Sequence, residues 1–143
     1  MPPSKLIDPE SLPTMTFDWG VIKPLVAVDN TEAPDVSLMH VVLLPGQGHV
    51  RHNHPDSDEI LYILAGRGEQ MVDDEQAFPV GPGQAVFIPK GAFHSTVNTG
   101  WEPLAILAIY APAGAEEALK GLPDYRELAP GEAPPLTRSA ASP

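Results

Sequence analysis

Proline and glycine interrupt this chain so often that long helices do not fit between them. Eighteen prolines and twelve glycines are spread over 143 residues, and they separate short runs rich in β-branched, aromatic and other apolar residues. Such runs between turn-forming residues are typical of β-strands. The sequence predicts seven strands, over 21–28, 36–44, 59–66, 69–74, 84–89, 94–99 and 104–110. Because no helical pattern separates them, the expected fold is an all-β sandwich or barrel.

The two ends of the chain differ from its middle. Residues 1–16 and 123–143 are rich in proline, serine and alanine and show no periodicity, while 113–122 has the pattern of a short helix. We therefore expect one domain with three parts. These are an N-terminal arm (1–16), a barrel (17–112), and a short helix with a proline-rich C-terminal tail (113–143), both arms being irregular.

Charge and composition exclude several classes of partner. The chain carries 8 lysines and arginines against 19 aspartates and glutamates, a formal net charge of −11. This charge opposes binding to nucleic acid and to anionic membranes, so we expect neither as a partner. The absence of cysteine excludes disulfides and thiol nucleophiles. With no apolar run of membrane-spanning length and no secretory signal pattern, the expected location is cytoplasmic.

Three of the five histidines lie within six residues of one another, which is the densest chemical signal in the chain. His52 and His54 are two residues apart, so in a strand their side chains share one face. Glu59 opens the next apolar run and can return to the imidazole pair. Two nitrogens and one carboxylate oxygen on neighbouring strands make an incomplete coordination sphere for a divalent transition metal.

A fourth possible ligand comes from a second glycine-rich block. His94 begins the predicted strand over 94–99. It can join the other three only if the chain between Gly66 and Pro82 folds out and back as a tight hairpin. Two short strands with short turns fit that length.

The two blocks together resemble the cupin family. The first reads G(X)5HXH(X)3–4E(X)6G, with Gly46, His52, His54, Glu59 and Gly66 at the required spacings.

The second block is similar to the second cupin motif, G(X)5PXG(X)2H(X)3N. It matches at Gly83, Pro89, Gly91, His94 and Asn98, and no position departs from either pattern.

This resemblance implies a double-stranded β-helix of the jelly-roll type that holds one divalent metal ion. The ligands carried over from the motifs are His52, His54, Glu59 and His94. Nitrogen and oxygen donors in this number suit Fe, Mn, Co, Ni, Cu or Zn alike. Small cupins are usually dimers, so the resemblance also implies a homodimer.

Such a site supports more than one chemistry. Three neutral imidazoles and one carboxylate leave a divalent ion with a charge near +1 and with free positions for substrate. The leading hypothesis is a dioxygenase-type oxidoreductase acting on a small carbonyl- or carboxylate-bearing molecule. The alternatives are a lyase or isomerase that uses the metal as a Lewis acid, and a metal-containing binding or sensing protein without turnover. Glu59 is the candidate catalytic residue, as a proton carrier.

The other two histidines receive separate interpretations. His40 lies in a predicted strand, but the sequence does not fix which face it occupies. His49 lies in an expected turn and is expected to be exposed to solvent. Asn98 is expected to anchor backbone at a turn, and the acidic triplet 73–75 to be a solvated turn. The candidates for the pocket walls are Phe87, Phe93 and Tyr110, together with either Gln70 or Met71, depending on register.

Overall fold

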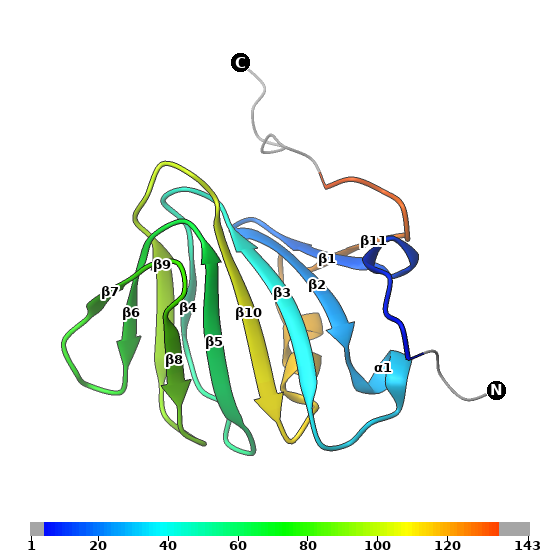
Figure 1. The fold of residues 1–143 in the computed structure, drawn as a ribbon, viewed down its shortest axis with the longest axis horizontal. Helices are drawn as coiled ribbons and strands as arrows, with labels where there is room; N and C mark the ends of the chain where they lie inside the picture. Colours follow the sequence, from blue (N-terminus) through cyan, green and yellow to red (C-terminus); the bar gives the residue numbers. More distant parts are fainter. Residues whose placement is uncertain (1–4, 135–143) are drawn as a thin grey trace.

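Two antiparallel sheets make up the body of the computed structural model, which describes residues 5–134 (Figure 1). The larger sheet has the strand order β11-β1-β2-β3-β10-β5-β8, and the smaller has the order β4-β9-β6-β7. The strands are β1 (Thr14–Phe17), β2 (Gly20–Val26), β3 (Ser37–Leu43), β4 (Gly48–His52), β5 (Asp58–Ala65), β6 (Gly68–Val72), β7 (Phe78–Val80), β8 (Ala85–Ile88), β9 (His94–Asn98), β10 (Leu104–Ala111) and β11 (Arg126–Leu128). This architecture confirms the expected all-β fold of the jelly-roll type.

Helical structure in the described residues is limited to short segments. The 3-10 helix η1 covers Pro9–Ser11, α1 covers Val28–Thr31, and the 3-10 helix η2 covers Ala115–Gly121. The short helix expected over 113–122 is therefore present, in the tighter 3-10 form. No helix among residues 5–134 has the length and apolar character needed to cross a membrane.

The core lies between the two sheets and follows the alternation of the strands. In β10, Leu104, Ile106, Ala108 and Tyr110 are buried, whereas the residues between them are only partly covered. Since successive side chains of a strand point to opposite faces, one face of the larger sheet lines the interior. The opposite face of β5 and β8 leaves apolar side chains in contact with solvent, and these are Ile60, Tyr62, Leu64 and Phe87.

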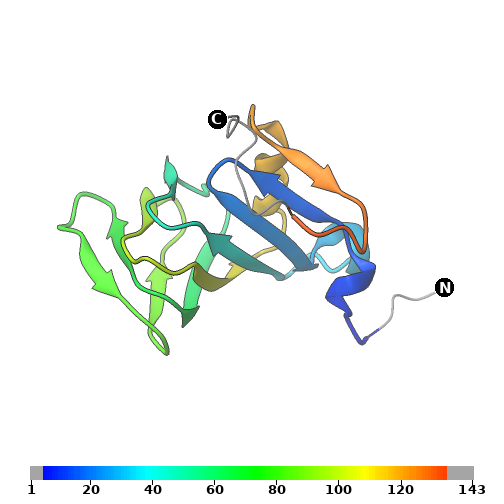
Figure 2. The same ribbon diagram turned by 90° about the horizontal axis from the view of Figure 1, so that it is seen from above.

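The terminal segments, expected to be irregular, each contribute one short strand. β1 pairs with β2 and with β11, so both segments extend the same edge of the larger sheet (Figure 2). In Figure 2 the orange β11 lies along the blue β1. These strands have four and three residues, too few to show a period of two in sequence. Residues 1–4 and 135–143 of the expected arms lie outside the described residues.

The connection that brings the second motif to the first is the expected hairpin. β6 and β7 pair antiparallel between Gly66 and Pro82, and β6 also pairs with β9. Gly66 has φ +86°, and a Cβ there would lie 2.5 Å from the carbonyl oxygen of Pro103. Only glycine fits this close approach, which lets β5 turn into β6 against the start of β10.

Candidate metal centre and pocket

The pairing of β4 with β9 brings the two motifs together. His52 and His94 are direct cross-strand partners, although they are 42 positions apart in the sequence. Their rings are 4.2 Å apart between centroids. The antiparallel register of the smaller sheet thus fixes the separation of these two imidazoles.

His54 follows β4 and is held by the turn that contains Gly91. The amide of Gly91 donates a hydrogen bond to the His54 carbonyl at 3.0 Å, and the Asn53 side chain donates to the Gly91 carbonyl at 3.3 Å. Gly91 has φ +83°, a left-handed conformation that favours glycine. The glycine of the second motif therefore positions a histidine of the first.

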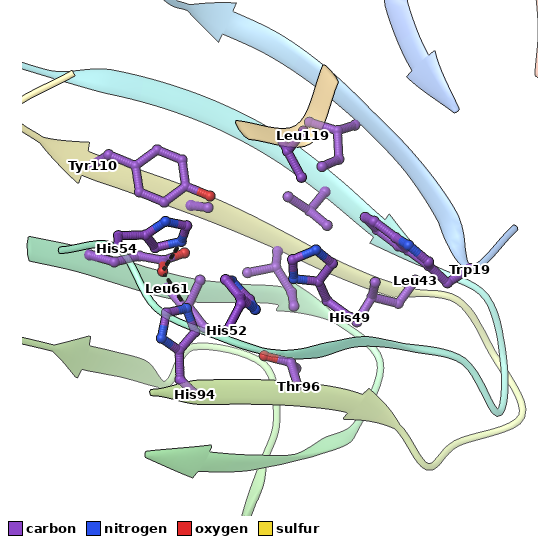
Figure 3. A pocket seen from close by; sticks show the side chains of 15 residues that line it. Trp19, Leu43, His49, His52, His54, Leu61, His94, Thr96, Tyr110 and Leu119 are labelled. Carbon is purple, nitrogen blue, oxygen red and sulfur yellow. Dashed lines mark ion pairs between the residues drawn. The ribbon is translucent and has the colours of Figure 1, made fainter. Parts of the chain in front are cut away.

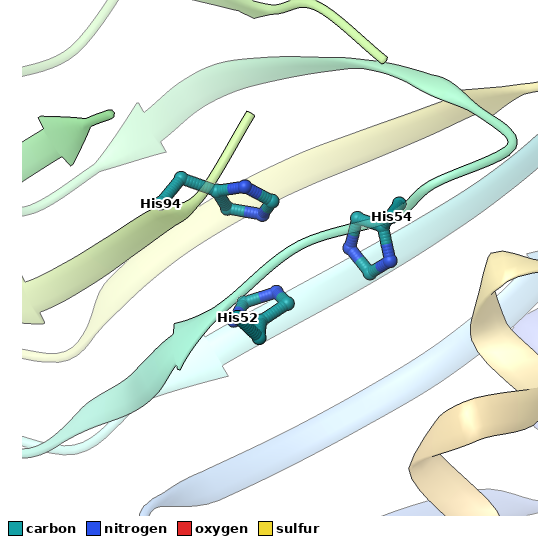
Figure 4. Close-up of side chains that lie close together, drawn as sticks. All are labelled: His52, His54 and His94. Atoms are coloured by element: carbon teal, nitrogen blue, oxygen red, sulfur yellow. The ribbon is translucent and has the colours of Figure 1, made fainter. Parts of the chain in front are cut away.

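One ring nitrogen from each of His52, His54 and His94 lies within 4.8 Å of the other two (Figure 4). In two of the rings the other nitrogen, Nδ1, lies close to a backbone carbonyl. The distance is 2.7 Å from His52 to Val50 and 3.0 Å from His94 to Ala92. A carbonyl can only accept, so Nδ1 carries the proton and the lone pair of Nε2 is free. This three-histidine cluster could hold a metal ion.

Glu59 lies against the same cluster from β5. Its Oε1 is 2.9 Å from Nε2 of His94 and 3.4 Å from Nε2 of His54, and the residue is only 4% exposed. None of these three atoms has a hydrogen-bond partner that meets full geometric requirements. Metal ligands lie this close together without hydrogen bonds between them, because their lone pairs all point at one cation.

Burial and mutual proximity set the charges of these groups. Burial lowers the pKa of His52 to about 3, with help from the neighbouring imidazoles of His49 and His94. Burial alone would raise the pKa of Glu59, but the imidazoles of His54 and His94 outweigh it and lower the pKa to about 2. Burial lowers the pKa of His94, yet the Glu59 carboxylate beside it produces a net rise. Metal binding requires an ionised Glu59 and a neutral His52, and these pKa shifts favour both states.

A cavity of about 60 Å³ opens beside the cluster (Figure 3). Its lining comes from both sheets and from η2. Seven of the fifteen lining residues are aliphatic: Ile22, Val41, Leu43, Leu61, Ile106, Ala108 and Leu119. The remaining lining residues are Trp19, Thr96, Tyr110, Glu59 and four histidines, His49, His52, His54 and His94. No lysine or arginine is among these lining residues.

His49 is a cavity residue that the sequence interpretation misplaced. It lies in β4, lines the cavity, and has its Nε2 buried. The pairing of β4 and β9 shifts register between His49 and His52. This irregularity lets two residues at an odd spacing face the same cavity, which strict alternation forbids. The high density of histidine was the only signal in the sequence that could have found it.

The remaining expectations have mixed outcomes. His40 lies on β3 between Met39 and Val41, which face inward, so it occupies the outer face and not the pocket. Tyr110 lines the cavity as expected, and burial together with the Glu59 charge raises its pKa. Phe87 and Phe93 are 60% and 44% exposed, so their assignment to the pocket walls was wrong.

Asn98 and the acidic turn behave as expected. The Asn98 side chain donates to the carbonyls of Leu43 and Glu102 and accepts from the Gly100 amide. It therefore anchors backbone. Residues 73–75 form an exposed turn after β6. Of the pair Gln70 and Met71, Gln70 points inward but accepts a hydrogen bond from Thr96 and does not line the cavity.

Comparison with known proteins agrees with the fold and the motifs. Residues 39–110 match the cupin domain family. The chain is 33% identical to glucose-6-phosphate isomerase of Thermococcus kodakarensis over 76% of this chain and 64% of that protein. It is also 33% identical to an uncharacterized protein of Methanocaldococcus jannaschii over 73% of this chain and 83% of that protein. The chain belongs to the cupin family.

Solved structures show the same architecture. A predicted oxalate decarboxylase of Thermotoga maritima superposes with a TM-score of 0.66 at 23% identity, covering 75% of this chain and 98% of that one. At that identity the likeness concerns the fold. The chain spans 64% or less of the length of the glucose-6-phosphate isomerases that it matches.

Proposed function

We propose that this cupin binds one divalent transition metal ion through His52, His54, His94 and Glu59 and uses it as a Lewis acid. The substrate class is a small molecule with a carbonyl or carboxylate group, and the reaction class is isomerisation or lyase cleavage. The single observation that carries this proposal is the convergence of imidazole nitrogens on the Glu59 carboxylate inside an otherwise apolar cavity.

The spacing of the donor atoms fits ligands of one ion. Two donors that are each about 2.1 Å from a metal and at right angles to one another stand about 3.0 Å apart. The distance of 2.9 Å between His94 Nε2 and Glu59 Oε1 matches this value. The backbone carbonyls of Val50 and Ala92 fix the tautomers of His52 and His94, as partners of metal-bound histidines usually do. When bound, such an ion polarises a carbonyl and stabilises the negative charge that develops on its oxygen.

Isomerase or lyase chemistry is better supported than the dioxygenase reading expected from the sequence. No feature of the described residues favours iron or oxygen chemistry over the other options. Several of the similar proteins are named glucose-6-phosphate isomerases, and a predicted oxalate decarboxylase shares the fold. The names describe the activities of the similar proteins. For this chain they support a class of reaction, and they do not identify a substrate.

The cavity itself restricts the substrate. A space of about 60 Å³ holds on the order of four or five water-sized groups. A phosphate dianion would find no lysine or arginine among the lining residues. We therefore propose a small keto or hydroxy acid as substrate, in place of a sugar phosphate.

A binding protein without turnover is the second candidate. Most of the lining is apolar, and only Glu59, Tyr110 and the histidines can exchange a proton there. A small ligand could therefore be held on the metal without reacting.

Proton exchange distinguishes these functions. Metal-free protein would be loaded separately with Mn, Fe, Co, Ni, Cu and Zn, and incubated in D2O with small keto acids, hydroxy acids and 1,3-dicarbonyls. Metal-dependent deuterium incorporation or product formation by NMR, absent in His94→Ala, is the expected result. Oxygen uptake in a parallel assay would establish the dioxygenase instead. A thermal shift by one of these compounds, without exchange or product, would favour the binder.

A further inference from the structure

The side chain of His49 is a polar group inside the cavity that the metal centre does not use. Its Nε2 is buried and has no hydrogen-bond partner among the described residues. Its ring packs edge-on against His52 at 4.0 Å and against Trp19 at 5.0 Å between centroids. Aromatic contacts on two sides hold the orientation of this ring without occupying its nitrogen.

The position of His49 excludes it from the metal cluster. The nitrogens that lie within 4.8 Å of one another belong to His52, His54 and His94. In Figure 3 His49 lies beyond His52, on the side of Trp19, whereas Tyr110 lies beside His54 at the opposite end. A molecule held at the cluster and extending into the cavity would therefore meet His49 with the part that the metal does not hold.

Few other groups in this half of the cavity can form a hydrogen bond. The hydroxyl of Thr96, the cross-strand neighbour of His49, already donates to Gln70. Ile22, Val41 and Leu43 supply only apolar surface. A buried polar nitrogen among such neighbours is costly unless a ligand satisfies it.

We propose that His49, held by Trp19, donates a hydrogen bond from Nε2 to an outer oxygen of the metal-bound molecule, and so selects chelating carboxylates over chelators without an outer oxygen. This inference rests on the proposed metal site. A neutral imidazole carries one N–H, so the role requires the Nε2–H tautomer and no change of charge. His49 is thus a specificity-determining residue at a position that neither cupin motif fixes, in the variable stretch between Gly46 and His52.

Two probes of different shape test the proposal in Co(II)-loaded protein, whose visible spectrum reports on ligands entering the coordination sphere. Oxalate chelates through two oxygens and keeps two outer oxygens, while pentane-2,4-dione chelates through two oxygens and keeps none. The variants are His49→Phe, which retains the ring contacts with Trp19 and His52, and His49→Gln, which retains an amide donor.

We expect His49→Phe to weaken oxalate binding about tenfold or more, since a hydrogen bond to a charged group is lost. Binding of pentane-2,4-dione and the Co(II) content should be unchanged, and His49→Gln should recover most of the oxalate affinity. Equal loss for both probes, or no loss for oxalate, would overturn the role of His49. Failure of the wild type to bind Co(II) would overturn the proposed function itself. This result is measured before any probe is added, so it is distinguishable from a failure of the role of His49.

Discussion

His52 and His94 face each other across the β4–β9 pair, and their Cα atoms are register partners. The hydrogen bonds of the sheet therefore determine how far apart the two imidazoles lie. Glu59 reaches His94 and the nearby His54 from the other sheet, because β5 belongs to the larger sheet and β9 to the smaller. The centre thus links the two layers, and a bound ion would connect them directly.

Replacing Glu59 with glutamine tests its place in the centre. The change removes a negative charge and one strong oxygen donor, while the shape of the side chain is kept. We expect divalent metal affinity to fall about 10- to 100-fold, by analogy with other changes near metal ligands. Competition with a chromogenic chelator measures the affinity, and circular dichroism verifies the fold.

Glu69→Gln is the matched control for that variant. Glu69 lies on β6 with its side chain exposed to solvent. Equal metal affinity of Glu59→Gln and Glu69→Gln would remove Glu59 from the ligand set.

The stability of the metal-free protein should depend on pH through its buried histidines. Burial lowers the pKa of His52 to about 3 and of His49 to about 4, whereas both have values near 6.5 when unfolded. Below pH 6.5 the unfolded chain binds protons that the folded chain does not, so the free energy of unfolding decreases as the pH falls. The raised pKa of His94 acts in the opposite direction, above pH 6.5.

Thermal unfolding at constant ionic strength measures this dependence. We expect the Tm of the metal-free protein to fall between pH 6.5 and pH 4, and His49→Phe to make the fall shallower. An unchanged or rising Tm over that interval would contradict the burial of these rings as neutral groups.

Asn98 is predicted to contribute to stability and not to chemistry. Its side chain is fully buried and makes three hydrogen bonds to backbone, at 2.9, 2.8 and 2.8 Å. Asn98→Ala leaves buried backbone groups without these partners and should lower the free energy of unfolding by about 2–4 kcal/mol. Urea denaturation measures the change, with the exposed Thr99→Ala as control. A loss no larger than that of the control would refute the anchoring role.

The homodimer remains a prediction. β1 pairs with β2 and β11 of its own chain, so the N-terminal segment described by the structure is already used within one subunit. Light scattering at micromolar concentration should give twice the mass of the chain, and a monomer mass would refute the expectation. A dimer that dissociates in Phe87→Glu would locate the contact on the exposed apolar face of β5 and β8. The cytoplasmic location and the expected absence of nucleic-acid and membrane partners likewise remain predictions.

Sequence reasoning found what depends on spacing and composition. The ligand candidates follow from fixed intervals around His52, His54 and His94, and the long strands follow from apolar runs between turns. The strands that it missed were β4, the edge strand β11 and β11's neighbour β1. β4 contains little apolar sequence, and it is held by pairing with β9, which is distant along the chain. The local sequence pattern therefore does not predict β4 as a strand.

The errors at His49 and Phe87, and the face of His40 that the sequence left open, concern the orientation of side chains. His40 and Phe87 occupy the outer face because tertiary pairing decides which residues of β3 and β8 point inward. His49 points inward because the register shifts between it and His52. The sequence shows which residues of a strand point inward only when apolar and polar residues alternate regularly. A shift in register breaks that alternation.

The metal content of the protein tests the central claim most directly. Protein purified without a histidine tag or chelator would be analysed by elemental mass spectrometry, beside His94→Ala and beside His40→Ala, whose histidine lies outside the cavity. We predict close to one equivalent of a divalent transition metal per chain in the wild type and in His40→Ala, and a large loss in His94→Ala. A wild type that contains no metal and takes none up on reconstitution would contradict the account, as would an equal loss in the two variants.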